Sequence, residues 1–242
     1  MSGLRGSSRG YGLPARLVLF VQLLATAATL GWVPGNPAKL MTMLVIWGLG
    51  FGRVRAAELL AMGGVDLLFV LMNAAALSRG SFVFDHPDLF GMPFYEFVMW
   101  GFYTLHTIRF LDGAAPRGRL IRAWAAAIAF ALPFALIAGP APLLTVAGLA
   151  FAACLVVFHE KMDFAYAGYM AALGVLIEYV GVWTGQWHYP GRPYGGVPLW
   201  SFVMWAGVGL FTRRMIVPLL PHLADSQIHP QDVPDPSRLR HD

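Results

Sequence analysis

Three carboxylic acids lie inside long apolar stretches of this chain, and these residues are the best placed for chemistry. Glu178 lies in "GVLIEYVGVWTG", Asp66 in "GGVDLLFVLMN" and Glu96 in "FYEFVMW". An ionisable side chain within a membrane span is costly, so each of the three is a candidate functional residue. A carboxyl group surrounded by apolar side chains can stay protonated and then donate a proton. We therefore expect Glu178, alone or as an acid pair with Asp66, to be catalytic.

The same carboxyl groups also have structural interpretations. Glu178 and Asp66 could be buried groups that only satisfy hydrogen bonds. Glu96 falls in the first turn of a predicted helix, where a carboxylate interacts favourably with the helix dipole. Gly174 and Gly181 share the helix face of Glu178 and would let a ligand or a second helix approach closely. Asn73 and Asp66, seven residues apart, share a helix face, and we include Asn73 in the binding site.

A repeated stretch lies close to these acids. "FDHPDLFGMPFYEFVMW" ends at Trp100, and "WHYPGRPYGGVPLWSFVMW" ends at Trp205. Proline is well tolerated in the first turn of a helix, so Pro93 and Pro198 predict matching helix starts. The repeat predicts two halves with the same orientation, related by an axis along the membrane normal. Trp100 and Trp205 could pack where the two halves meet.

Alignment of the two stretches pairs polar groups of two loops and leaves one acid unmatched. Asp85 aligns with His188, in predicted loops on one face of the membrane, where they could gate a site or position water. Glu178 aligns with Ala75. That asymmetry favours one active carboxyl group over a symmetric structural pair.

The composition explains why these residues are expected inside a membrane. Hydrophobic residues make up 57% of the 242 positions and charged residues 12%, against roughly 25% charged in soluble domains. The mean hydropathy is +0.60, and runs of about 20 apolar residues are long enough to span a bilayer. We predict an all-α polytopic transmembrane bundle of eight spans, at about 15–33, 38–52, 55–77, 92–111, 120–138, 141–158, 164–184 and 197–217.

The spans form two parallel four-helix repeats, over about 15–111 and 120–217, in one transmembrane domain. A cytoplasmic segment, 1–14, precedes them and a disordered cytoplasmic tail, 218–242, follows. With the N-terminus in the cytoplasm, all but Lys39, Arg79 and Arg192 of the 17 lysine and arginine residues fall on the cytoplasmic side. This positive-inside bias predicts a multi-pass protein of the inner membrane with both termini in the cytoplasm.

The stretch "LGVLIEYVGVWTGQWHYPGRPYGGVPLWSFVMW" resembles the signature of a carotenoid-biosynthesis membrane family. That family includes bisanhydrobacterioruberin-type carotenoid hydratases and is similar to the integral-membrane lycopene cyclases. The matching residues are Glu178, His188-Tyr189 and the Gly-Val-Pro that ends at Pro198. The chain departs from the family at Gln186-Trp187, where Phe-Gly is usual, and it lacks the paired-acid motif of the cyclases.

The resemblance implies an enzyme that protonates a terminal double bond of a carotenoid or other polyisoprenoid. Hydration or cyclisation would follow, with a lipid-soluble substrate that enters from the membrane. Glu178 would supply the proton, and aromatic faces would stabilise the carbocation. The predicted substrate-binding residues are Glu96, Asp85, His188, Trp183, Trp187, Tyr189, Trp200, Trp205, Trp100 and Asn73.

Other interpretations stay open. The chain could be a non-catalytic membrane subunit that binds a pigment or lipid within a homo-oligomer or larger complex, with His106 as one contact. Parallel repeats are also found in transporters. We expect no cofactor and no metal site. We also expect no nucleic-acid partner, because the basic residues are explained by topology. The charged "HEKMD" segment, from His159 to Asp163, is expected to be a solvated loop.

Overall fold

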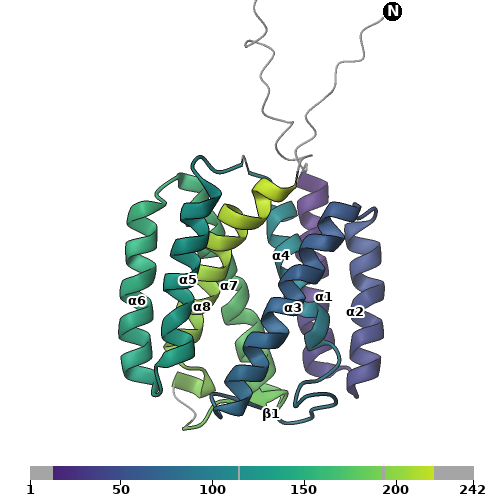
Figure 1. Ribbon diagram of the computed structural model, residues 1–242. Helices are drawn as coiled ribbons and strands as arrows, with labels where there is room; N and C mark the ends of the chain where they lie inside the picture. The colour runs from purple at the N-terminus through teal and green to yellow at the C-terminus, as the bar shows by residue number, and fades with distance from the viewer. Residues whose placement is uncertain (1–12, 114, 192–193, 221–242) are drawn as a thin grey trace, which may run out of the picture.

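Eight α-helices make up most of the part of the chain that the structure describes, which is residues 13–113, 115–191 and 194–220 of a computed structural model. The predicted all-α membrane bundle is confirmed (Figure 1). The helices are α1 (Leu13–Trp32), α2 (Asn36–Phe51), α3 (Ala56–Ser78), α4 (Glu96–Leu111), α5 (Leu120–Leu136), α6 (Pro140–Val157), α7 (Lys161–Trp183) and α8 (Leu199–Phe211).

The helices run alternately up and down, so the two described ends of the chain, Leu13 and Leu220, lie at the same face (Figure 1). We call this the terminal face and the opposite one, which carries the strands, the loop face. Among the described residues, α1, α3, α6, α7 and the segment Leu199–Leu219 are long and apolar enough to cross a membrane, and α5 is a shorter apolar helix. The predicted tail lies, from residue 221 on, outside the described residues.

One predicted helix start shifts, and the last predicted helix is divided. The chain makes a turn after Pro93, in which the Glu96 amide donates to the Pro93 carbonyl (3.0 Å), so α4 begins three residues later than the proline. Pro198 directly precedes α8 as predicted. The last predicted helix is divided: α8 is followed by a π-helical turn over Thr212–Ile216 and a 3-10 turn over Val217–Leu219.

Two short strands join the loops that the repeat relates. β1 (Val83–Phe84) pairs antiparallel with β2 (Trp187–His188), and Phe84 lies opposite Trp187. The alignment that pairs Asp85 with His188 also matches Phe84 with Trp187, so these two aligned residues are partners in space. Whether the two halves of the bundle superpose as repeats stays a prediction.

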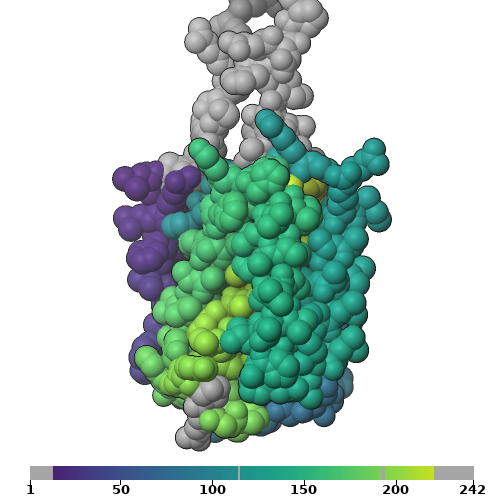
Figure 2. Space-filling model, turned by 90° about the vertical axis from the view of Figure 1, so that its left-hand side faces the viewer, coloured from purple at the N-terminus to yellow at the C-terminus, as the bar shows by residue number. Residues whose placement is uncertain are grey.

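The helices pack in pairs. α3 packs on α4 and α7 on α8, and these four helices form the middle of the bundle. The α1–α2 hairpin lies at one end, against α4 and α7, and the α5–α6 hairpin lies at the other, against α8 (Figure 1). Figure 2 shows this second end of the molecule, with part of α8 visible between α6 and α7. The outer surface of α6 is apolar, with Leu149 and Val156 largely exposed, as lipid contact requires.

A buried ion-pair cluster closes the second half at the terminal face. Asp163 is fully buried and accepts hydrogen bonds from Arg213 Nη1 (2.5 Å) and Arg214 Nε (2.8 Å). Glu160 accepts from Arg213 Nη2 (2.7 Å). Burial opposes ionisation of Glu160, but its hydrogen bonds and the charges of Arg213 and Arg214 outweigh this effect and lower its pKa. The expected solvated loop is therefore wrong for Asp163, whose charge is paired inside the protein.

A simpler pair occupies the matching place in the first half. Arg109, near the end of α4, donates to Glu58 from Nη2 (2.8 Å) and from Nε (3.2 Å), and to the carbonyl of Phe51 (2.7 Å). Glu58 is the third residue of α3, as Asp163 is of α7. Glu58 and Asp163 are as far apart in sequence as Arg109 and Arg214, which supports the predicted duplication.

Candidate functional site

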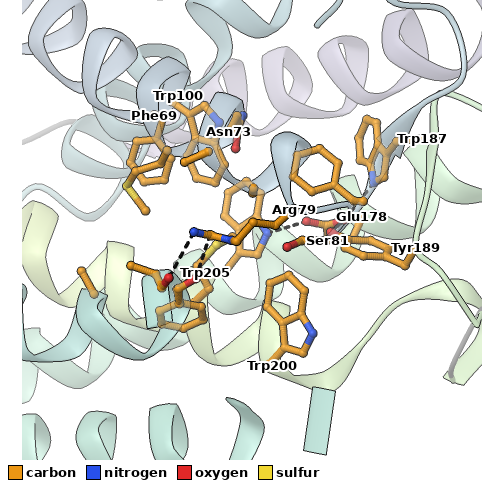
Figure 3. A pocket seen from close by; sticks show the side chains of 18 of the residues that line it. Phe69, Asn73, Arg79, Ser81, Trp100, Glu178, Trp187, Tyr189, Trp200 and Trp205 are labelled. Carbon is orange, nitrogen blue, oxygen red and sulfur yellow. Dashed lines mark hydrogen bonds between the residues drawn. The ribbon is translucent and has the colours of Figure 1, made fainter. Parts of the chain in front are cut away.

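A cavity of about 320 Å³ opens between α3 and α5 on the loop-face side of the bundle. Pockets of about 300–1,000 Å³ are typical of small-ligand sites. Apolar and aromatic side chains form most of its lining, and the charged groups in it are Glu96, Glu178 and Arg79. Figure 3 shows aromatic rings grouped around Arg79 and Glu178.

Glu178 accepts hydrogen bonds from three aromatic side chains. Trp205 Nε1 donates to its Oε1 (2.9 Å), while Trp187 Nε1 (3.0 Å) and the Tyr189 hydroxyl (2.9 Å) donate to its Oε2. Trp205 lies in α8, Trp187 lies in β2 and Tyr189 directly follows β2. The carboxyl group of Glu178 therefore joins α7 to α8 and to the β2 segment. All of the groups are buried, and an unpaired buried donor would be costly. Glu178 therefore fixes the aromatic lining of the cavity.

The glycines that flank Glu178 make room for these rings. A side-chain carbon at Gly174 would overlap the Trp205 indole, and one at Gly181 would overlap the Trp187 ring. The small residues were expected to admit a ligand or a helix. In the structure, two tryptophans of the same chain fill that space.

Glu96 is the second carboxyl group of the cavity. Asn73 Nδ2 (2.7 Å) and Trp100 Nε1 (2.9 Å) both donate to its Oε1. Its Oε2 receives no hydrogen bond from any described residue. Trp100 stacks on Trp205 with ring centroids 4.5 Å apart, so each indole of the stack is bonded to one carboxyl group. The predicted packing of Trp100 on Trp205 is present, and both line the cavity.

The structure brings Glu178 together with Glu96 and not with Asp66. Asp66 faces α4, and its Oδ1 accepts the backbone N–H of Gly101 (2.6 Å). A side-chain carbon at Gly101 would overlap Asp66, so the contact needs a glycine. Asp66 does not line the cavity, and the expected acid pair of Glu178 and Asp66 is not assembled.

Three predicted binding residues lie outside the cavity. Asp85 Oδ1 is 2.6 Å from His188 Nδ1 on the loop face, where both side chains are partly exposed. Trp183 is 72% exposed and donates to the carbonyl of Gly195 (3.0 Å). These residues line a separate hollow of the loop face. Tyr189 and Trp200 do line the cavity, with their rings edge to face at 5.8 Å.

One cavity residue was missed by the sequence analysis. Arg79, just after α3, was counted only for topology, yet it lines the cavity. Its guanidinium donates from Nη1 to the carbonyl of Ala135 (3.1 Å) and from Nη2 to that of Phe134 (3.0 Å), both in α5 (Figure 3). The presence of an arginine on the face where lysine and arginine are rare could have been the signal.

The described residues contain no cluster of three or more His, Cys, Asp or Glu side chains that could hold a metal ion. His106 is buried beside Phe110 and Tyr169, which stack on each other with ring centroids 4.7 Å apart. Its Nε2 is 2.6 Å from the Tyr169 hydroxyl.

Comparison with known proteins identifies the fold. No protein-family model matches the chain, and no curated protein matches it. Two crystal structures do match. The mycobacterial Insig homolog MvINS from Mycobacterium vanbaalenii has a TM-score of 0.59 and 17% identity, over 73% of this chain and 98% of that one. A cross-linked trimer of a variant of MvINS has a TM-score of 0.58 with the same identity and coverage. This chain is therefore a multi-pass membrane protein with an Insig-like fold.

The resemblance to carotenoid-biosynthesis enzymes is wrong. The structural matches are to an Insig homolog, not to a hydratase or a cyclase. Two residues that carried the resemblance, Glu178 and Tyr189, are hydrogen-bonded to each other. An acid buried among aromatic side chains meets the packing needs of a helix bundle as well as those of an acid catalyst, which is why the motif misled.

Proposed function

We propose that this protein is a non-catalytic membrane subunit that binds an amphipathic membrane lipid in the cavity between α3 and α5. Its mouth lies between two helices that contact the hydrocarbon region, so a lipid can enter sideways. The observation that carries the proposal is the mixed lining. Most of it is apolar, with residues such as Leu68, Met72 and Met204. It also contains Arg79, just after α3, and Glu96, the first residue of α4, at the loop-face ends of their helices.

Glu96 is the proposed partner of the polar end of this lipid. Its Oε2 receives no hydrogen bond from the described residues, while Asn73 and Trp100 hold the other oxygen in place. A lipid hydroxyl group could donate to Oε2, and buried acceptors gain from such a partner. The aromatic rings of Trp100 and Trp200 would pack on the apolar body next to it.

A binding role agrees better with Glu178 than an acid role does. Both of its oxygens already accept hydrogen bonds from rigid aromatic side chains, and Trp187 and Trp205 can only donate. A general acid must present its proton to the reacting atom. The contacts of Glu178 serve the shape of the cavity instead, so we assign it a positioning role.

The proposal also covers the orientation of the protein in the membrane and its self-association. Of the described lysine and arginine residues, all but Lys39 and Arg79 lie at or near the terminal face. We propose that this face is cytoplasmic, which places the polar end of the cavity in the outer leaflet. Because MvINS has been crystallised as a cross-linked trimer, we also propose that this chain self-associates.

Photolabelling tests the binding proposal. The purified protein is reconstituted with a phospholipid that carries a diazirine in its acyl chain, irradiated and mapped by mass spectrometry. We expect adducts on cavity residues such as Met72 and Met204 in addition to the outer surface. Adducts confined to outward-facing residues such as Leu149 and Val156 would contradict the proposal.

A further inference from the structure

The mouth of the cavity is crossed by one cation. Arg79 lies at the end of α3, exposed to solvent, and its two hydrogen bonds to the carbonyls of Phe134 and Ala135 join α3 to α5. α5 ends at Leu136, so these carbonyls lie in its last turn, where no later helical N–H reaches them. The guanidinium thus caps α5 while it closes part of the mouth.

A second cavity, of about 240 Å³, adjoins the first at this point. Arg79, Ser81, Tyr189 and Trp200 line both. Of the described residues that line the second cavity, Arg79 is the only charged one, and no carboxyl group is among them. The acids of the first cavity, Glu96 and Glu178, lie farther in. A lipid that enters from the second cavity would therefore meet the cation, Arg79, first and the carboxyl groups of Glu96 and Glu178 afterwards.

We propose that Arg79 binds the anionic headgroup of the lipid, so that the ligand class is a phospholipid with a net negative charge. This inference rests on the proposed function of the first cavity. A guanidinium offers a planar fork of N–H donors that matches two oxygens of a phosphate. The two N–H groups that now bond to α5 carbonyls would turn to the phosphate, and water would take over the exposed carbonyls.

This exchange also couples binding to the opening of the mouth. With Arg79 bonded to Phe134 and Ala135, α3 and α5 are held together at the loop face. A phosphate that takes the guanidinium releases α5, which widens the path between the two cavities. A zwitterionic phospholipid carries the same phosphate, but its own cationic group offsets that charge. It would therefore compete less strongly for the guanidinium and would enter less readily.

Fluorescence quenching by brominated lipids tests this inference on the full chain. Trp100, Trp187, Trp200 and Trp205 line the first cavity, so bromine on an acyl chain quenches them when the lipid is inside. Phosphatidylglycerol is compared with phosphatidylcholine of the same brominated chains. Quenching from outside the cavity is subtracted with an Ala131→Phe variant, whose new side chain would fill the space that Ala131 lines.

We expect cavity quenching to favour phosphatidylglycerol by roughly tenfold in affinity, as a charge-assisted hydrogen bond of about 1.5 kcal/mol implies. Arg79→Gln should abolish the preference, and Arg79→Lys should retain part of it. The control is Arg122→Gln, which removes a charge from exposed Arg122 of α5 and should leave the preference unchanged. A thermal unfolding curve for each variant shows that the fold is intact.

The outcomes separate the two proposals. Equal cavity quenching by both lipids, or an unchanged preference in Arg79→Gln, would overturn the role of Arg79 alone. Absence of any cavity-dependent quenching in the wild-type protein would overturn the proposed function itself. Displacement of the bound lipid by inorganic phosphate alone would assign the arginine to free phosphate and refute the lipid headgroup.

Discussion

Each outer hairpin of this bundle meets the central helices differently. α1 packs directly on α7, and a side-chain carbon added at Gly31 would lie 3.1 Å from Thr184 Cγ2 and 3.2 Å from Val180 Cγ1. Between α5 and α3, by contrast, there is a cavity lined by both helices and bridged by Arg79. One interface is closed by packing and the other is open.

The two interfaces also differ at one position of the hairpins. Gly31 comes four residues before Gly35, and Ala135 comes four residues before Gly139. Both of the later glycines have a positive φ, 77° and 101°, in the turn before the next helix. At the closed interface the glycine lets two helices touch. At the open interface an alanine takes its place, and its carbonyl accepts a hydrogen bond from Arg79. The open interface is where a ligand site can exist.

Removal of the Glu178 carboxyl group should have the largest effect, because it holds the lining of the open interface. Glu178→Ala leaves the donors of Trp187, Tyr189 and Trp205 without their acceptor, at about 1–3 kcal/mol for each buried group. We expect the free energy of unfolding to fall by at least about 3 kcal/mol. The single cysteine, Cys154, is buried, so a thiol-reactive dye reports unfolding in detergent.

Glu178→Gln is the matched control, because the amide oxygen can still accept a hydrogen bond. Its loss of stability should be clearly smaller than that of the alanine variant. Equal unfolding temperatures for Glu178→Ala and the wild-type protein would show that the three hydrogen bonds do not organise the cavity.

A large side chain at the closed interface should have an intermediate effect. Gly31→Phe forces α1 away from Val180 and Thr184, and overpacking of this kind costs about 1–3 kcal/mol. Gly48→Phe is the control, since nothing lies within 4 Å of the added carbon there. If both variants unfold at the wild-type temperature, the α1–α7 interface is not tightly packed, and the contrast with the α3–α5 interface is lost.

Much of the fold could be predicted from the sequence, because membrane spans and helix direction depend on local composition. The position of Glu178 among aromatic side chains could also be anticipated. The partner of Glu178 could not, because Asp66 and Glu96 are both polar residues in apolar surroundings, and only helix packing decides which one faces the cavity. Arg79 was missed for the same reason: its acceptors are backbone carbonyls of α5, which have no signature in the sequence.

The paired acids at the terminal face show the limit of reasoning from charge. Asp163 was assigned to a solvated loop, since acids near Lys161 are usually exposed. Its burial depends on Arg213 and Arg214, 50 and 51 residues away. A carboxyl group with arginine partners is structural here, whereas the cavity acids bond only to neutral donors.

We propose that the open α3–α5 interface holds a lipid, and native mass spectrometry of two α5 variants tests this proposal. Ala131 lines the cavity, and exposed Ala129 on the same helix does not. We predict that Ala131→Phe loses the lipid that co-purifies with the wild-type protein, while its free energy of unfolding changes by no more than about 1 kcal/mol. The control variant, Ala129→Phe, should retain the lipid. Equal lipid retention by Ala131→Phe and the wild-type protein would contradict the account.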